Sequence, residues 1–451
     1  MPAGGLFGAL EGDPGVDRHV DDVAVLGALV ETEVALVRAA ARVGFVPGEA
    51  ASAVSAAAQR LVVDIEELAQ RSVSGGNPVI PLVQELSAIV PESARPWVHI
   101  GATSQDILDT ALMVIAHRAT ERISERTWAG ALAAGRLADA HRDTVMVGRT
   151  LGQQAVPTTF GVKAAGWSAG LLEGQRDLIE VRNRLPVQLG GAGGTLAVFG
   201  EHGPAVVSAL AAEIGLADPR TPWHTERTRV RRLAASLGSV TAAAGKVATD
   251  VVLLAQSEIA EVAEGGGHGG SSAMPHKHNP IGSVLVRSNA TRTPAMVNAL
   301  YSAGMPENER AFGSWHAEWQ PLRHLLVLTG GASARITTVL EGLQVDAARM
   351  KVNLEAARPA VMAESLATAL APHLGRLHAQ QVVTEALTEA IGADFPERAV
   401  VDAVQRATGV DADVITQALE PASYLGAAEE FVERALADVH EAGVHEREEQ
   451  S

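Results

Sequence analysis

The chain has 451 residues, with 36 basic and 53 acidic side chains and a formal net charge of −17. It contains no cysteine, which excludes disulfides, thiolate nucleophiles and cysteine-bound zinc or iron–sulfur clusters. The acidic balance and an aromatic content of 3% argue against a nucleic-acid partner. The hydrophobic content of 47% is typical of a folded globular protein.

The sequence contains no recognisable targeting signal. Residues 1–13 lack the basic region and the long apolar run of a secretory leader. The longest notable uncharged stretch, 185–200, is rich in glycine and shorter than a membrane span. We therefore expect a cytoplasmic protein with no membrane partner.

Apolar residues at helical spacing dominate the chain and predict a helical protein. The first helix is expected over 21–43 and ends at Gly44, a residue favoured after helix C-termini. A second helix is expected to begin near Ser104, because residues 103–106 have the form of a capping box, and to continue to about Arg142. Further helices are predicted over 161–184, 282–303, 321–345 and 361–391. No run of alternating apolar and polar residues predicts a strand.

The clearest helical pattern covers 226–263. Its apolar residues recur at alternating spacings of three and four, at Val230, Leu233, Leu237, Val240, Ala244, Val247, Val251 and Leu254. This repeat is typical of a coiled-coil seam, and a helix over the whole range is roughly 55 Å long. Such a helix cannot bury its seam inside a small monomer, which predicts a bundle shared between subunits.

These patterns predict an all-α fold in three parts. We expect an N-terminal helical domain over 1–104, a central long-helix bundle over 105–348, and a C-terminal helical domain over 349–451.

Three polar, glycine-rich segments interrupt this apolar background, at 98–106, 148–159 and 265–280. The third offers the hydroxyls of Ser271 and Ser272, the ammonium of Lys277 and the amide of Asn279. Such donors suit a carboxylate that gains a second negative charge as an enediolate forms. They also allow a serine to act as a base, because its alkoxide needs stabilisation. Taken alone, however, a glycine–serine loop is most often an ordinary polar loop.

Two other patterns resemble cofactor sites but lack the residues or spacing that such sites require. His268, His276 and His278 lie close together, yet no acidic residue nearby completes a ligand set, so no metal is predicted. Residues 190–195 are rich in glycine, but they lack the GxGxxG spacing and follow no predicted strand. We therefore expect no cofactor.

Residues 270–279 read Gly-Ser-Ser-Ala-Met-Pro-His-Lys-His-Asn. This run matches the GSSxMPxKxN signature of the fumarase/aspartase superfamily. The segments 99–106 and 148–159 resemble the first and second conserved regions of that superfamily, in the same order. The resemblance extends over most of the chain. It implies an all-helical homotetramer with a twenty-helix core, in which three subunits build each active site.

The resemblance also implies roles for particular residues. Ser271 is expected to be the catalytic acid and base, and Lys277 to act with it and, together with Asn279, to hold the carboxylate that becomes the enediolate. The remaining expected substrate-binding residues are His99, Thr103, Ser104, Arg149, Thr150, Gln153, Ser272, Met274 and Arg310. For Arg149 and Arg310 a surface or helix-capping ion pair is an equal alternative.

The sequence departs from the amine-releasing members of the superfamily at two places. Those members carry Thr-His in the second region, where this chain has Thr150-Leu151, and an early His-Asp pair, where it has Asn77-Pro78. An amine leaving group benefits from a general acid, worth about 10²–10⁴ in rate. A carboxylate, whose conjugate acid has a pKa of about 4, departs without one. The missing histidines therefore favour a bond between carbon and a carboxylate oxygen.

The longer resemblance is to the branch of bacterial 3-carboxy-cis,cis-muconate cycloisomerases. It rests on the segments 188–195, 222–224, 305–310, 313–319 and 421–426. It implies a small tricarboxylate substrate that is closed to a lactone during protocatechuate degradation. Two alternatives stay open: an adenylosuccinate-type carbon–nitrogen lyase, and an inactive homologue with a structural or binding role.

Overall fold

The computed structural model describes residues 6–265, 274 and 277–449. The regular secondary structure of this part is helical apart from two pairs of short strands. It divides into two compact units, each assembled from three chain segments. The first comprises Met1–Trp128, Glu173–Gly245 and Leu285–Ile336, and the second comprises Ala129–Leu172, Lys246–Val284 and Thr337–Ser451.

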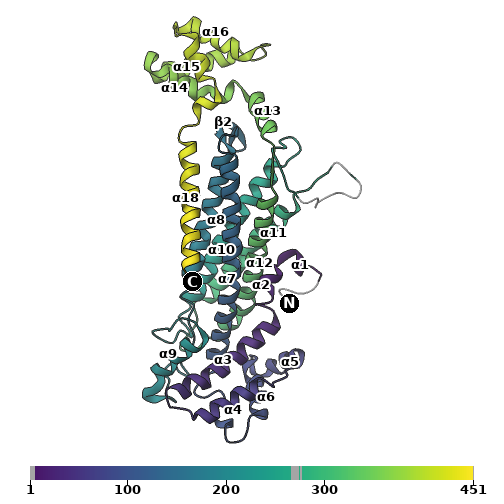
Figure 1. Ribbon diagram of the computed structural model, residues 1–451, viewed down its shortest axis with the longest axis vertical. Coiled ribbons are helices and arrows are strands. Elements are labelled where there is room, and N and C mark those ends of the chain that lie inside the picture. Colours follow the sequence, from purple (N-terminus) through teal and green to yellow (C-terminus); the bar gives the residue numbers. More distant parts are fainter. Residues whose placement is uncertain (1–5, 266–273, 275–276, 450–451) are drawn as a thin grey trace. The chain divides into compact units, whose positions relative to one another are not determined.

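Five long helices each contribute to both units (Figure 1). They are α7 (Ser104–Ala140), α8 (Phe160–Arg182), α10 (Thr228–Leu254), α11 (Ile281–Ala303) and α12 (Ser314–Gly342). Within the first unit, their apolar faces meet in one core with residues such as Ile107, Leu237 and Leu325, all at most 1% exposed.

Shorter helices complete the first unit. They are α1 (Gly8–Glu11), α2 (Pro14–Asp17), α3 (Asp22–Arg42), α4 (Gly48–Ala58), α5 (Ile65–Gly75), α6 (Val79–Ile89) and α9 (Gly203–Ile214), with 3₁₀ turns η1 (Arg95–Trp97) and η2 (Gly200–His202). Helix α3 begins at the cap Asp21, whose side chain accepts the Ala24 N–H. It packs against α4 and α9, as the shared core cluster and Figure 1 indicate.

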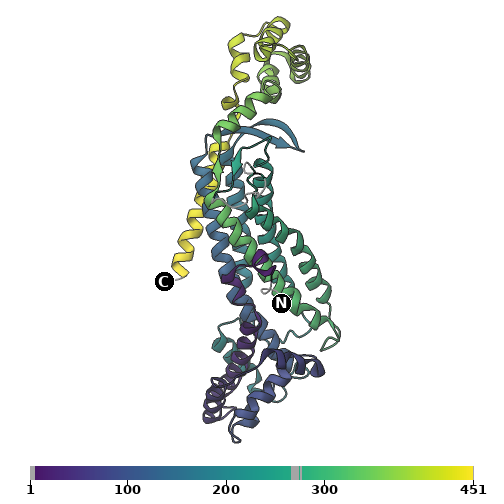
Figure 2. The same ribbon diagram turned by 90° about the vertical axis from the view of Figure 1, so that its right-hand side faces the viewer.

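The second unit contains the strands and the C-terminal helices. The hairpin of β1 (Val145–Thr150) and β2 (Gln153–Thr159) forms a two-stranded ribbon (Figure 2), and β3 (Val262–Ala263) pairs with β4 (Gln344–Val345). The helices are α13 (Ala347–Ala357), α14 (Ala363–Leu374), α15 (Arg376–Glu389), α16 (Pro396–Thr408), α17 (Ala412–Ala418) and α18 (Ala428–Glu449), with η3 (Ala360–Met362) and η4 (Pro421–Tyr424). Val147 of β1 belongs to the core of α13–α17.

The predicted seam of α10 is confirmed as its buried face. All eight seam residues are at most 4% exposed. By length and composition α10 could cross a membrane, but the burial of this seam inside the protein already accounts for its apolar character. The predicted extent, 226–263, is wrong at its C-terminal end. The helix ends at Leu254 because a turn follows, in which Ala260 has a φ of 52° and the Glu261 N–H bonds the Leu254 carbonyl at 2.9 Å.

Other predicted elements need correction. The helix expected from 321 begins at Ser314, so Pro321 lies inside it rather than at its start. The helix expected over 361–391 is two helices, separated at Gly375, whose φ of 76° is incompatible with a continuous helix. The β1–β2 hairpin was not predicted at all. The all-α class is nevertheless confirmed, and the division into three domains stays a prediction.

Candidate active site

Asp106, in the first turn of α7, ties three separate segments together. Its carboxylate accepts the backbone N–H groups of Thr103, Gly190 and Gly191, each at 2.9 Å. It also lies 2.6 Å from Nε2 of His224, and both side chains are buried. Because Asp106 caps α7 and binds the glycine-rich loop at the same time, the first motif is held rigidly by its own chain.

Glycine is required where this loop passes the first motif. Gly101 has a φ of 65°, and a Cβ on it would lie 2.5 Å from the ring of Phe199. Gly191 has a φ of 69°, and its Cβ would lie 2.9 Å from the Gly101 carbonyl oxygen. The glycines of 190–194 therefore allow two backbones to approach closely.

Arg310 binds the same loop. Its guanidinium donates to the carbonyls of Gly191 and Ala192 at 2.9 Å and to the Gln105 side chain at 3.0 Å. These contacts place Arg310 beside the first motif, as its predicted role requires. They also occupy its donors with protein acceptors, so its binding to substrate stays a prediction.

A buried ionic cluster lies in the same unit. Arg227 donates to Asp109 at 2.7 Å and to Glu318 at 3.1 Å, and its guanidinium stacks on Trp223 at 4.7 Å. Trp315 donates to Asp109 at 3.0 Å. Burial raises the pKa of Glu318, although the charge of Arg227 opposes this effect. The cluster fixes α7 and α12 to the residue directly before α10, because leaving any of these charges unpaired in the interior is costly.

His99 contacts a second buried acid. Its Nδ1 lies 2.7 Å from Oε1 of Glu33, a residue of α3 that is 2% exposed. Burial of the imidazole lowers the pKa of His99, but the hydrogen bond and charge of Glu33, together with Asp106, outweigh burial and raise it. The structure thus favours the charged form of this predicted site residue.

The second motif folds as the β1–β2 hairpin. Leu151 and Gly152 form its two-residue turn, with φ values of 51° and 78°. This turn type fits the twist of a hairpin, but it normally selects asparagine or glycine. Leu151 is instead fully exposed in a conformation that is unfavourable for its side chain, and Thr150 and Gln153 beside it are also exposed.

Arg149, on the same hairpin, is paired with a buried acid. It donates to the two carboxylate oxygens of Glu261 at 2.9 and 2.7 Å, and Asn353 donates to the same carboxylate at 2.8 Å. Glu261 is fully buried. The charge of Arg149 is therefore neutralised by a buried acid, which is neither the surface pair nor the helix cap of the alternative, and its role in substrate binding stays a prediction. A cavity of about 430 Å³ at this place is lined by Arg149, Gly152, Gln153, Gln154, Glu258, Ile259 and Asn353.

The third motif is described only in part. Ser271 and Ser272 lie outside the described residues. Met274 and Lys277 are exposed, and Asn279 is half-buried just before α11. The N-terminus of α11 is occupied by Glu264, whose carboxylate accepts the N–H groups of Gly282 and Ser283 at 2.9 and 2.8 Å. This contact fixes the chain on both sides of the signature.

The predicted residues thus fall into two groups. His99, Thr103, Ser104 and Arg310 meet around the Asp106 loops in the first unit. Arg149, Thr150 and Gln153 lie on the hairpin of the second unit, which also contains Met274, Lys277 and Asn279.

Comparison with known proteins identifies the family. A family model described as a lyase matches residues 17–294, which is more than half of the chain. The chain belongs to this lyase family. This confirms the membership of the fumarase/aspartase superfamily that the signature predicted.

Several relatives of this lyase match almost its whole length. It is 43% identical to a nitrosuccinate lyase of Streptomyces davaonensis, over 96% of this chain and 94% of that protein. It is 41% identical to a 3-carboxy-cis,cis-muconate cycloisomerase of Pseudomonas aeruginosa, over 98% of both chains. The crystal structure of a 3-carboxy-cis,cis-muconate lactonizing enzyme from Pseudomonas putida superposes with a TM-score of 0.90 and 36% identity, over 97% of this chain and 99% of that one.

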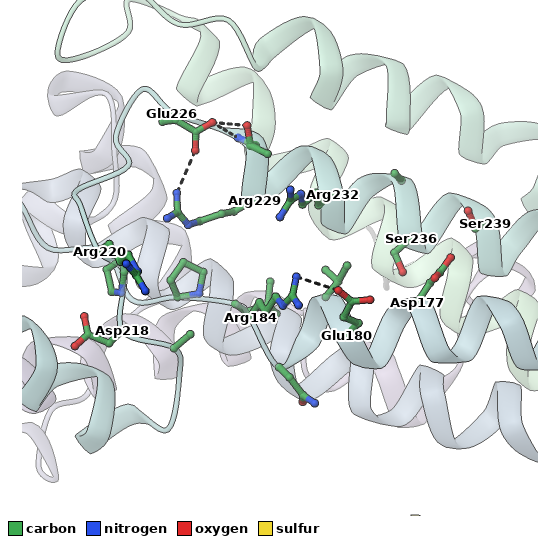
Figure 3. Close-up of a pocket in the computed structure, with 18 residues that line it drawn as sticks. Asp177, Glu180, Arg184, Asp218, Arg220, Glu226, Arg229, Arg232, Ser236 and Ser239 are labelled. Atoms are coloured by element: carbon green, nitrogen blue, oxygen red, sulfur yellow. Dashed lines mark hydrogen bonds and ion pairs between the residues drawn. The ribbon is translucent and has the colours of Figure 1, made fainter. Parts of the chain in front are cut away.

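A larger groove lies away from these motifs in the part of the lyase that the structure describes. Its volume is about 850 Å³, and it lies between the end of α8 and the start of α10 in the first unit (Figure 3). Four arginines line it, of which Arg184 pairs with Glu180 at 2.9 Å and Arg229 with Glu226 at 3.1 Å. Among the described lining residues none is a predicted site residue, so the groove is not part of the candidate active site.

Sequence reasoning missed Glu33, Asp109 and Arg227 in this lyase. A signal existed for Glu33, because it stands on the apolar face of its helix, four residues after Leu29 and four before Val37. An acid at such a position needs a buried partner. The sequence could not name that partner, since His99 is 66 residues away.

Proposed function

We propose that this lyase is a cycloisomerase that closes 3-carboxy-cis,cis-muconate to 4-carboxymuconolactone. One carboxylate oxygen of the substrate adds to a carbon of the conjugated double bond. The electron pair moves onto a second carboxylate, which becomes an enediolate, and a proton is then delivered to the adjacent carbon. The atoms of substrate and product are the same, so the reaction requires no oxidant, reductant or second substrate.

The residue assignments follow the superfamily signature. Ser271 delivers the proton, or removes it in the reverse direction. Lys277 and Asn279 hold the carboxylate as its second charge develops. The exposure of Lys277 supports this role, because an exposed ammonium remains available to a ligand. Thr103, Ser104, Thr150 and Gln153, with Ser272 and Met274, bind the other parts of the substrate.

Leu151 is the observation that carries the proposal. It occupies the hairpin tip where the amine-releasing members have a histidine, and its side chain can neither donate nor accept a proton. A reaction at this site must therefore work with a weakly basic leaving group. The carboxylate oxygen of a lactone meets that requirement, whereas the amine of an adenylosuccinate-type substrate does not.

A second candidate function is the elimination of nitrite from nitrosuccinate. The observation that favours it is the 43% identity to a nitrosuccinate lyase. Nitrite, like a carboxylate, is a weakly basic anion, so Leu151 is equally compatible with its departure. In this reaction Ser271 removes a proton from the carbon next to one carboxylate, and the carbon–nitrogen bond on the neighbouring carbon breaks.

A direct comparison of the two substrates tests the proposal. We expect the purified lyase to consume 3-carboxy-cis,cis-muconate, followed by loss of its diene absorbance, with at least about tenfold higher kcat/KM than nitrosuccinate, followed by nitrite release. The reverse order would replace the first function with the second. Release of fumarate and AMP from adenylosuccinate would overturn both. A folded protein that transforms none of these substrates would be an inactive homologue.

The Ser271→Ala variant tests the assignment of the acid and base. We expect kcat to fall by roughly 10³-fold or more, because the residue acts on the reacting proton in either reaction. Thermal unfolding should stay unchanged. Near-normal turnover would contradict the role of Ser271.

We also propose that the lyase is a cytoplasmic homotetramer in which three subunits contribute to each site. The exposure of Thr150, Leu151 and Gln153 in the single chain supports a shared site. Light scattering should give about four times the chain mass of 46.8 kDa, and a monomer with full activity would contradict the shared site.

A further inference from the structure

Glu33 is a buried acid with a single polar contact to the described part of the chain. It lies in the middle of α3, is 2% exposed, and approaches Nδ1 of His99 at 2.7 Å through Oε1. Its other oxygen, Oε2, is buried and has no hydrogen-bond partner within the described residues. A buried carboxylate with so few donors depends on the charge of its partner.

The backbone of His99 is held in an unusual conformation. Its φ is 58°, a value that residues other than glycine adopt infrequently. The following Gly101 also has a positive φ, and it packs against Phe199 and Gly191. Strained residues of this kind persist where the surrounding structure holds them, and they are concentrated in binding sites.

The two nitrogens of His99 have different surroundings. Nδ1 faces Glu33, whereas Nε2 makes no hydrogen bond to the described part of the chain. The side chain keeps 21% of its surface exposed. One nitrogen is thus fixed inside the protein, and the other is available to a ligand.

Charges around the ring favour imidazolium. Glu33 acts on it from α3 and Asp106 from α7. The loop 190–194, which packs against Gly101, contributes no titratable side chain. Burial opposes the charge, but the two carboxylates outweigh it and keep the pKa of His99 above its usual value.

Two other predicted cations, the arginines at 310 and 149, are already engaged by protein acceptors. Arg310 donates to Gly191, Ala192 and Gln105, and Arg149 is paired with Glu261. Among the predicted site residues of the first unit, His99 therefore has the basic group best able to meet an anionic substrate.

We propose that Glu33 is a positioning residue, which holds His99 so that its Nε2–H binds a carboxylate of the substrate. This inference deepens the proposed function and rests on it in one respect, namely that the substrate is an anion. Both candidate substrates meet that condition, since both carry carboxylates. Glu33 itself does not touch the substrate.

Binding of tricarballylate, a saturated tricarboxylate, tests this inference without turnover. Calorimetry between pH 6.5 and 9 should give wild-type affinity that weakens as His99 loses its proton. In Glu33→Gln we expect affinity about 10- to 100-fold lower at pH 7.5, because a charge-assisted contact is lost. The weakening should also begin at a lower pH, since the carboxylate that raises the pKa of His99 is gone. The matched control is Glu31→Gln on the same helix, where the acid is exposed and pairs with Arg118; it should bind like the wild type.

Two further variants separate positioning from folding. His99→Gln should bind tricarballylate as weakly as Glu33→Gln, with no dependence on pH in this range. The double variant should be no weaker than His99→Gln, because Glu33 acts through His99. Wild-type affinity in His99→Gln, an unchanged pH profile in Glu33→Gln, or no binding by the wild type would overturn the inference. Failure to turn over either substrate, with these binding results intact, would overturn only the proposed function.

Discussion

The first and second motifs are held by the chain in opposite ways. At 99–106, the backbone and side chains are bound to buried partners, with Asp106 at the centre. At 150–153, the predicted binding side chains are exposed, and Leu151 occupies a conformation unfavourable to it. The first motif is therefore preorganised by its own chain, whereas the second offers groups that the single chain leaves in solvent.

This difference indicates where each motif derives its specificity. A buried network determines position and charge, as at His99, and tolerates little change. An exposed hairpin tip can change its chemistry at little cost in stability, as the replacement of histidine by Leu151 illustrates. Variation between members of this lyase family is thus expected at the hairpin tip. The segments 99–106 and 190–194, which Asp106 holds together, are expected to vary little.

The largest loss of stability around the first motif is expected from Arg227→Met. This change leaves Asp109 and Glu318 buried without their cation, and we expect the free energy of unfolding to fall by about 3–5 kcal/mol. Urea denaturation measures the loss. The control is Arg232→Met on α10, the helix that begins directly after Arg227, because Arg232 is exposed and has no acidic partner within the described residues. Equal stability of the two variants would contradict the role of the cluster.

A smaller effect is expected from Asp106→Asn. The amide keeps the size of the side chain but places an N–H where backbone donors and His224 converge. We expect a loss of about 2–3 kcal/mol, because charged hydrogen bonds are replaced by a mismatched one. Activity should fall together with stability, since the position of Thr103 depends on the same carboxylate. A stable variant with low activity would instead make Asp106 a catalytic group.

The smallest effect on stability is expected from Leu151→Gly. Relief of the positive φ, worth about 1–2 kcal/mol, is largely offset by the flexibility of glycine in the unfolded chain. The melting temperature should therefore change little. We expect kcat/KM to fall about tenfold or more, since an apolar contact to the substrate or a neighbouring subunit is removed. Unchanged activity would make the tip an ordinary exposed turn and remove the contrast with the first motif.

Much of this molecule could be predicted from local patterns. The helix over 21–43 forms as Asp22–Arg42, the capping box near Ser104 begins α7, and the seam of α10 is buried. The hairpin could not be predicted in this way, because β1 and β2 lack alternating apolar residues and are covered by other elements only in part. The partners of Arg149 and Arg310 could not be predicted either, since Glu261 and Gly191 are more than 100 residues away along the chain.

The sequence alone determined the helical class, the superfamily and the residues that carry its signature, because these depend on periodicity and on residue types at fixed spacings. Only the tertiary structure decided which charges are available and which are already paired. That Arg149 is neutralised by Glu261, while His99 is supported by Glu33, follows from contacts between distant segments. Charge depends on burial and on neighbours in space, and neither is specified by spacing along the chain.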